Sequence, residues 1–239
     1  MMGQISSKPL SEIRKALRPK WYRIPLDTVT LRGLSERSDL QGAFQTLGHL
    51  GLWGITALVS FYCYSHQIWV GFVVALFLHG TVGSHFAHAF HELCHGTVFR
   101  TKGLNTFFLL IFSLFGWLNY HIYKMSHSYH HRFTCFPEGD LEVVLPREPS
   151  LSFQVLLKLF TINIFGNGGI TDIIKNFFKI AFNRFDTPFN SWTEALYDGQ
   201  SEERRKAKIW ARIVLSFHGL IFIFSFGFEE PIWILLLSL

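Results

Sequence analysis

Long apolar stretches with almost no charge constrain this chain more than any other feature. Two of them cover residues 44–64 and 68–90, and a third covers residues 209–226. Each is roughly as long as a helix must be to cross the ~30 Å hydrocarbon core of a bilayer. Because only helices and closed barrels satisfy their backbone within lipid, these stretches predict helical spans. We therefore predict an all-α integral membrane protein that crosses the bilayer several times.

The link between the first two stretches, Ser65 to Gln67, predicts an antiparallel helical hairpin because it is so short. Basic residues gather before residue 38, ahead of the first stretch, and the chain has a net charge of +5. A basic flank in this position sets membrane orientation and holds the N-terminus in the cytoplasm. We assign it that role rather than nucleic-acid binding. The predicted organisation is a basic cytoplasmic segment over residues 1–42 and a membrane domain over residues 43–239.

Three further segments refine this plan. Residues 104–120 are apolar but short, and they carry polar residues near both ends. Residues 151–170 are typical of an amphipathic helix that lies in the membrane interface. The run SEERRKAK at residues 201–208 predicts a helix start before the third span. A last apolar stretch begins at Pro231 and extends over only ~13 Å of helix before Leu239, which leads us to expect a fragment of a longer protein.

Histidines form two tight clusters, HELCH at residues 91–95 and HSYHH at residues 127–131. On a helix, His91 and His95 share one face, and His88 lies close to it. The same geometry places His127, His130 and His131 on one side of a second helix. Uncharged imidazoles in an apolar setting need partners, and a metal ion is an efficient one. The isolated histidines, such as His49, His66, His79 and His218, are better explained as ordinary core or interfacial residues.

Three kinds of metal site compete. HELCH fits H-E-x-x-H, the pattern of zinc peptidases in which a glutamate acts as general base. That interpretation leaves HSYHH unused, and the last apolar stretches hold no aspartate as a third ligand. Haem needs only single facing histidines, so it leaves both clusters unexplained. Two adjacent irons need many nitrogen ligands, which favours iron.

The two clusters, with their surroundings, resemble the first two histidine boxes of the integral-membrane fatty acid desaturase superfamily. HELCH is similar to its HxxxH box, and HSYHH to its HxxHH box. The run HGTVFRTKGLN after the first box and HHRFTCFPEGDLE in the second also resemble this family, with Thr134 and Asp140 at the expected places. The likeness covers residues 68–145 well and the flanking spans loosely.

The resemblance implies two iron ions bound by His91, His95, His127, His130 and His131, with His88 as a weaker candidate. It implies transmembrane hairpins with a cytoplasm-facing cap that carries the histidine boxes. The implied enzyme uses O₂ to introduce a double bond into an acyl chain that enters from the bilayer. A lipid hydroxylase or carotenoid ketolase on the same scaffold is an alternative. Electrons would come from a separate carrier such as ferredoxin or cytochrome b5.

Two features test this resemblance. The third box of the family, (H/Q)xxHH, is absent, so we expect the chain to lack roughly three ligands, and an inactive truncated product remains an alternative. In addition, both boxes can serve one centre only if they lie on the same side of the membrane. The hypothesis therefore requires residues 104–120 not to cross the bilayer.

Overall fold

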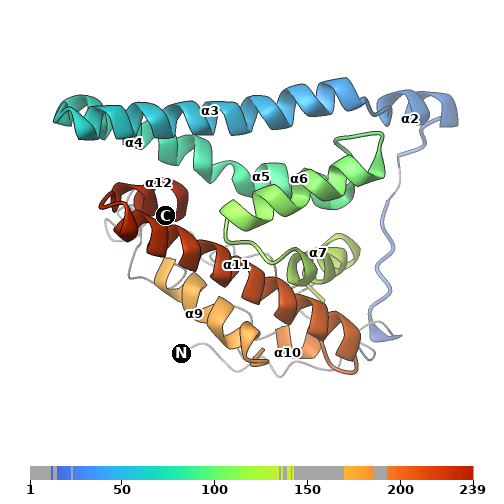
Figure 1. Cartoon of the computed structure of the whole chain (residues 1–239). Coiled ribbons are helices and arrows are strands. Elements are labelled where there is room, and N and C mark those ends of the chain that lie inside the picture. The colour runs from blue at the N-terminus through green and yellow to red at the C-terminus, as the bar shows by residue number, and fades with distance from the viewer. Residues whose placement is uncertain are drawn as a thin grey trace, which may run out of the picture. The chain divides into compact units, whose positions relative to one another are not determined.

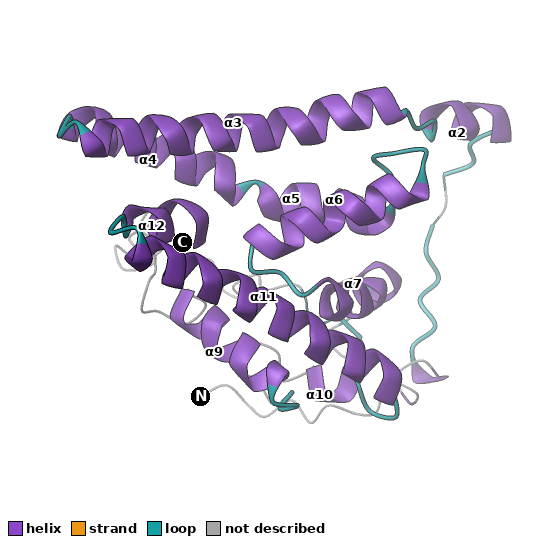
Figure 2. Ribbon diagram, in the orientation of Figure 1, coloured by secondary structure: helices purple, strands orange, loops and turns teal. Residues whose placement is uncertain are grey.

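Helices make up all the regular structure in the described part of the chain. The computed structural model describes residues 12, 15–22, 24–134, 136, 139–140, 142, 170–185 and 193–238. No strand occurs among these residues, and Figure 2 shows helices joined by loops and turns. The all-α prediction is confirmed. The chain packs as two units, Met1–Tyr22 with His121–Leu215, and Arg23–Tyr120 with Ser216–Leu239.

Figure 1 follows the helices along the chain. The unit that begins at Arg23 holds α2 (Thr28–Leu34), α3 (Asp39–Ser65), α4 (Trp69–Ser84), α5 (Phe86–His95), α6 (Lys102–Phe115) and α12 (Ile232–Ser238). The other unit holds α7 (Tyr120–Phe133), α9 (Ile170–Ala181) and α10 (Thr193–Leu196). The long helix α11 (Ser201–Gly227) contributes its first part to this unit and its second part to the other.

Three stretches of helix are long and apolar enough to cross a membrane: Thr28–Ser65, Trp69–His95 and Ser201–Gly227. They correspond to the three spans expected from the sequence, to within one residue at the start of the second. Helices α3 and α4 lie side by side as the predicted hairpin (Figure 1). Their tight turn depends on Gln67, whose φ of 57° is left-handed, and on Ile68, whose N–H donates to the carbonyl of Cys63 at 2.8 Å. Because three of its helices are long and apolar enough to cross a membrane, the chain is a membrane protein.

Most of the apolar segment at residues 104–120 forms the short helix α6, which ends at Phe115. It has 14 residues, so it extends over ~21 Å and is shorter than the hydrocarbon core. Gly116 caps it, and Trp117 takes a left-handed φ of 52° before α7 begins as a separate helix. The length of α6 agrees with a non-spanning segment. A fourth span is counted only if α6 and α7 together are taken as one broken span.

Two buried histidines tie α12 to its neighbours. The Nε2 of His79 donates to the carbonyl of Leu236 at 2.9 Å, and its Nδ1 lies 3.0 Å from the hydroxyl of Thr56. The ring of His218 stacks on Trp117 with centroids 3.9 Å apart. Both ring nitrogens of each histidine have protein partners, since His218 contacts Ser238 and Leu114 at 2.9 Å. They are core histidines, as expected, and neither is placed to ligate haem.

The first part of α11 packs beside α9 (Figure 1). The guanidinium of Arg212 donates to the carbonyl of Ala181 at 3.0 Å. Arg204 pairs with Glu194 at 3.1 Å and lies over the ring of Phe185. The helix α11 begins at Ser201, as predicted. The interfacial helix expected at residues 151–170 falls outside the described residues, apart from Ile170.

Candidate metal centre

The first cluster lies in the last turns of α5. The helix ends cleanly because Gly96 adopts a left-handed φ of 66° and its N–H donates to the carbonyl of Leu93 at 3.0 Å. A residue without a Cβ adopts this conformation at little cost, which explains the glycine directly after HELCH. The predicted helical form of HELCH is confirmed.

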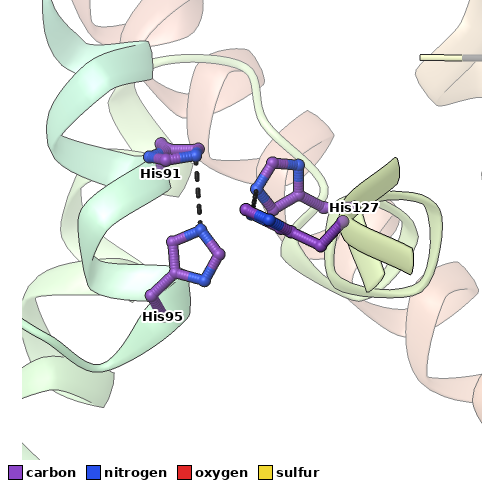
Figure 3. Close-up of side chains that lie close together, drawn as sticks. His91, His95 and His127 are labelled. Carbon is purple, nitrogen blue, oxygen red and sulfur yellow. Dashed lines mark hydrogen bonds between the residues drawn. The ribbon is translucent and has the colours of Figure 1, made fainter. Parts of the chain in front are cut away.

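His91 and His95 point their rings toward each other from successive turns of α5 (Figure 3). Their Nε2 atoms are 3.3 Å apart. The other ring nitrogen of His91, Nδ1, lies 2.8 Å from Oε1 of Glu92. Oε2 of the same carboxylate accepts from the hydroxyl of Thr97 at 3.2 Å. Because a carboxylate only accepts, Nδ1 of His91 carries the proton and Nε2 keeps its lone pair for another partner.

The loop after α5 is held by two polar anchors. Asn105 accepts from the N–H of Phe99 at 3.0 Å and donates to its carbonyl at 2.8 Å, and it is buried. Asp39, at the start of α3, accepts from both the N–H and the hydroxyl of Thr101, at 2.9 and 2.7 Å. Gly42 allows this approach, because a Cβ there would lie 2.8 Å from the carbonyl of Val98. The asparagine of the run HGTVFRTKGLN thus has a structural role.

The second cluster lies in the C-terminal half of α7. His127 and His131 face each other with their Nε2 atoms 3.0 Å apart. Figure 3 marks this bond beside the labelled His127. The ring of His127 is buried and stacks with the rings of Tyr123 and His130, whose centroids are 4.7 and 5.4 Å away. The predicted helical form of HSYHH is confirmed, and so is the common side of its three histidines.

Carboxylates also lie behind two histidines of α7. Nδ1 of His127 lies 3.1 Å from Glu142, and Nδ1 of His130 lies 3.0 Å from Asp140. Both acids follow the helix in sequence, in the run DLE at residues 140–142. The sequence analysis assigned no contact to these acids, because the contacts depend on how the chain after α7 approaches the helix. The spacing D-x-E shortly after a histidine box is the signal that could have indicated them.

The donor set suits a transition metal. Each facing pair presents two Nε2 atoms, the imidazole donors that transition metals bind, and the carboxylates behind three of the histidines fix the proton on the other nitrogen. Glu92 contacts Nδ1 of His91, on the side of the ring away from the facing Nε2 atoms. A peptidase base must instead face the metal-bound water. The geometry of Glu92 therefore disfavours the zinc-peptidase hypothesis.

The expected ligands differ in how well they are placed. His91 faces His95, and His127 faces His131, within each helix. His130 instead stacks on His127 and directs its Nδ1 to Asp140. The exposed ring of His88 has its centroid 5.2 Å from that of His85, a neighbour outside the expected ligand set.

An all-helical membrane protein with paired imidazoles at the ends of two helices belongs to the class of histidine-rich membrane metalloproteins. The comparison with protein families narrows this class. Residues 67–239 match the family described as fatty acid desaturase. The match covers more than half of the chain, so this protein belongs to the fatty acid desaturase family. Family membership makes it a lipid oxidoreductase of the desaturase type. Comparisons with curated proteins and with solved structures return no match.

Proposed function

We propose that this protein is a desaturase that removes hydrogen from the acyl chain of a membrane lipid. Its metal centre would consist of two iron ions bound by His91, His95, His127, His130 and His131. The observation that carries the proposal is the pair of facing Nε2 atoms in each histidine cluster, 3.3 Å apart in α5 and 3.0 Å apart in α7. When bound, iron supplies the activation of O₂ and the abstraction of hydrogen from an unactivated C–H bond.

In this proposal the histidines bind the metal, and neighbouring carboxylates orient the histidines. The carboxylates of Glu92, Glu142 and Asp140 hold the proton on Nδ1 of His91, His127 and His130, which leaves a lone pair on Nε2 of these three rings for a metal. The exposed apolar side chains of α3 and α4, such as Leu58 and Phe77, face lipid, from which the acyl substrate enters. We further propose that the histidine boxes face the cytoplasm, where a separate carrier such as ferredoxin or cytochrome b5 delivers electrons.

Metal loading tests this function. The full chain, incubated with Fe(II) without oxygen and freed of excess metal, should retain two irons per chain. Replacing His91 and His95 with alanine, or His127 and His131, removes one facing pair in each case. If the pairs share one centre, either double variant loses nearly all the tightly bound iron. Independent pairs would each keep about half of it.

Suitable controls sharpen this result. The exposed His66, at the turn between α3 and α4, is replaced by alanine to control for losing an imidazole, and we expect it to keep the full iron content. Retention of one zinc per chain with no iron uptake would contradict the proposal. Supplied with an acyl lipid, O₂ and a reduced carrier, the iron-loaded protein should yield a product that lacks two hydrogens. A product that gains an oxygen atom would identify the hydroxylase alternative instead.

A further inference from the structure

The loop that follows α7 turns back onto the helix it leaves. The N–H groups of Gly139 and Asp140 both donate to the carbonyl of Phe136 at 2.9 Å. A Cβ at Gly139 would lie 2.6 Å from the ring of Phe133, so the backbone can approach the helix only because this residue is glycine. This close approach brings the two acids that follow within reach of the histidines of α7.

Asp140 is the more deeply placed acid. Its side chain is only 1% exposed, and a buried carboxylate is costly unless it is hydrogen-bonded. Both its oxygens lie within 3.1 Å of Nδ1 of His130, and Oδ1 also accepts from the N–H of Glu142 at 3.1 Å. That second bond orders the backbone at Glu142, whose own carboxylate lies 3.1 Å from Nδ1 of His127. The two acids therefore act as a linked pair.

We propose that Asp140 and Glu142 are positioning residues of the metal centre. Each accepts the Nδ1 proton of one histidine, Asp140 from His130 and Glu142 from His127, and so fixes the tautomer that leaves Nε2 unprotonated. A carboxylate in this position also raises the basicity of the ligand nitrogen and stops the ring from rotating. This inference rests on the proposed metal site and assigns the support of two of its histidines to Asp140 and Glu142, which follow α7.

His127 and His130 differ in how far each is held by its carboxylate and how far by packing against neighbouring rings. His127 stacks against the rings of Tyr123 and His130, in addition to its contact with a carboxylate. Nδ1 of His130 contacts both oxygens of Asp140, at 3.0 and 3.1 Å. The side chain of His130 is also more exposed than that of His127, 25% against 9%. We therefore expect His130 to depend on its carboxylate more than His127 does.

The test uses Co(II) as the metal probe, because its visible absorption reports the ligands. Asp140→Asn and Glu142→Gln keep the shapes of the side chains and remove their charges. Each should weaken Co(II) binding by ~10–100-fold in competition with a chelator, with the larger loss for Asp140→Asn. Asp140→Glu keeps the negative charge, so it should bind Co(II) more tightly than Asp140→Asn does. The matched control is Asp172→Asn, which removes a surface carboxylate paired with Lys175 in α9.

A second readout separates positioning from folding. The unfolding temperature of the metal-free variants should stay close to that of the wild-type protein, while the Co(II) spectrum changes. If Asp140→Asn fails to fold, Glu142→Gln carries the test, since this acid is partly exposed. Wild-type affinity and spectrum in both charge-removing variants would overturn the inference while leaving the metal site intact. Failure of the wild-type chain to take up Co(II) would overturn the metal site itself, and this inference with it.

Discussion

His121 illustrates how one residue couples burial to pH. It is the second residue of α7 and is partly buried, and desolvation by burial lowers its pKa. The charges of Lys206 and Lys124 act in the same direction, and that of Glu203 acts against them. A histidine with a lowered pKa binds fewer protons in the folded state than in the unfolded state. Its contribution to stability is therefore present above the unfolded pKa of about 6.5 and is lost as the pH falls below it.

We expect the unfolding temperature of the metal-free protein to fall when the pH is lowered from about 7.5 to about 5.5. His121→Gln, which cannot titrate, should lose less over the same interval. Thermal unfolding in detergent at the two pH values measures the difference. His66→Gln controls for removing an imidazole at an exposed site. An equal loss in His121→Gln and the wild-type protein would show that desolvation of His121 does not contribute.

At the scale of the element, the loop between α5 and α6 lies closely against α3 at Gly42. Gly42→Ala places a Cβ 2.8 Å from both the carbonyl of Val98 and the ring of Phe99. Because backbone cannot move aside cheaply, we expect a loss of ~1–3 kcal/mol, seen as a lower unfolding temperature in detergent.

Gly48 offers a matched control on the same helix, since nothing lies within 4 Å of a Cβ built there. Gly48→Ala should be neutral or stabilising by up to ~1 kcal/mol, because alanine favours the helix. Equal effects of the two substitutions would mean that the loop does not rest on α3 as described.

These elements also show which features the sequence could predict. The helical period of His91 with His95, and of His127 with His131, is local, so the form of both clusters followed from spacing alone. The hairpin of α3 and α4 followed from two apolar stretches and a short link. The support of the site did not, because it rests on non-local approach. Asp140 reaches His130 only because Gly139 packs against Phe133, and such packing leaves no periodic pattern in a sequence.

At the scale of the whole molecule, the two histidine clusters can share a centre only if the two ends of α6 lie on the same side of the membrane. We expect Lys102, at the start of α6, and Lys124, in α7, to face the same side of the membrane. Single cysteines at these positions, in a chain whose native cysteines are replaced by alanine, should both react with a membrane-impermeant maleimide from one side of sealed vesicles. Ser65→Cys, at the turn after α3, should react only from the other side.

Permeabilised vesicles, in which all three positions should react, control for accessibility. Reaction of position 124 together with position 65 would mean that α6 and α7 cross the bilayer between them. The shared iron centre would then be excluded, because a membrane thickness would separate its two halves.

The facing pairs also have a consequence for the order of events during synthesis. His91 and His95 are one helical turn apart, so their pair forms as soon as α5 coils, before α7 has been made. Translation adds about 5–20 residues per second, which leaves a few seconds between the two pairs. The nascent chain would thus expose an unfinished binding site to whichever divalent cation the cell offers first. Faithful loading of this protein then depends on how slowly the first pair captures an ion, as much as on how tightly the finished centre holds it.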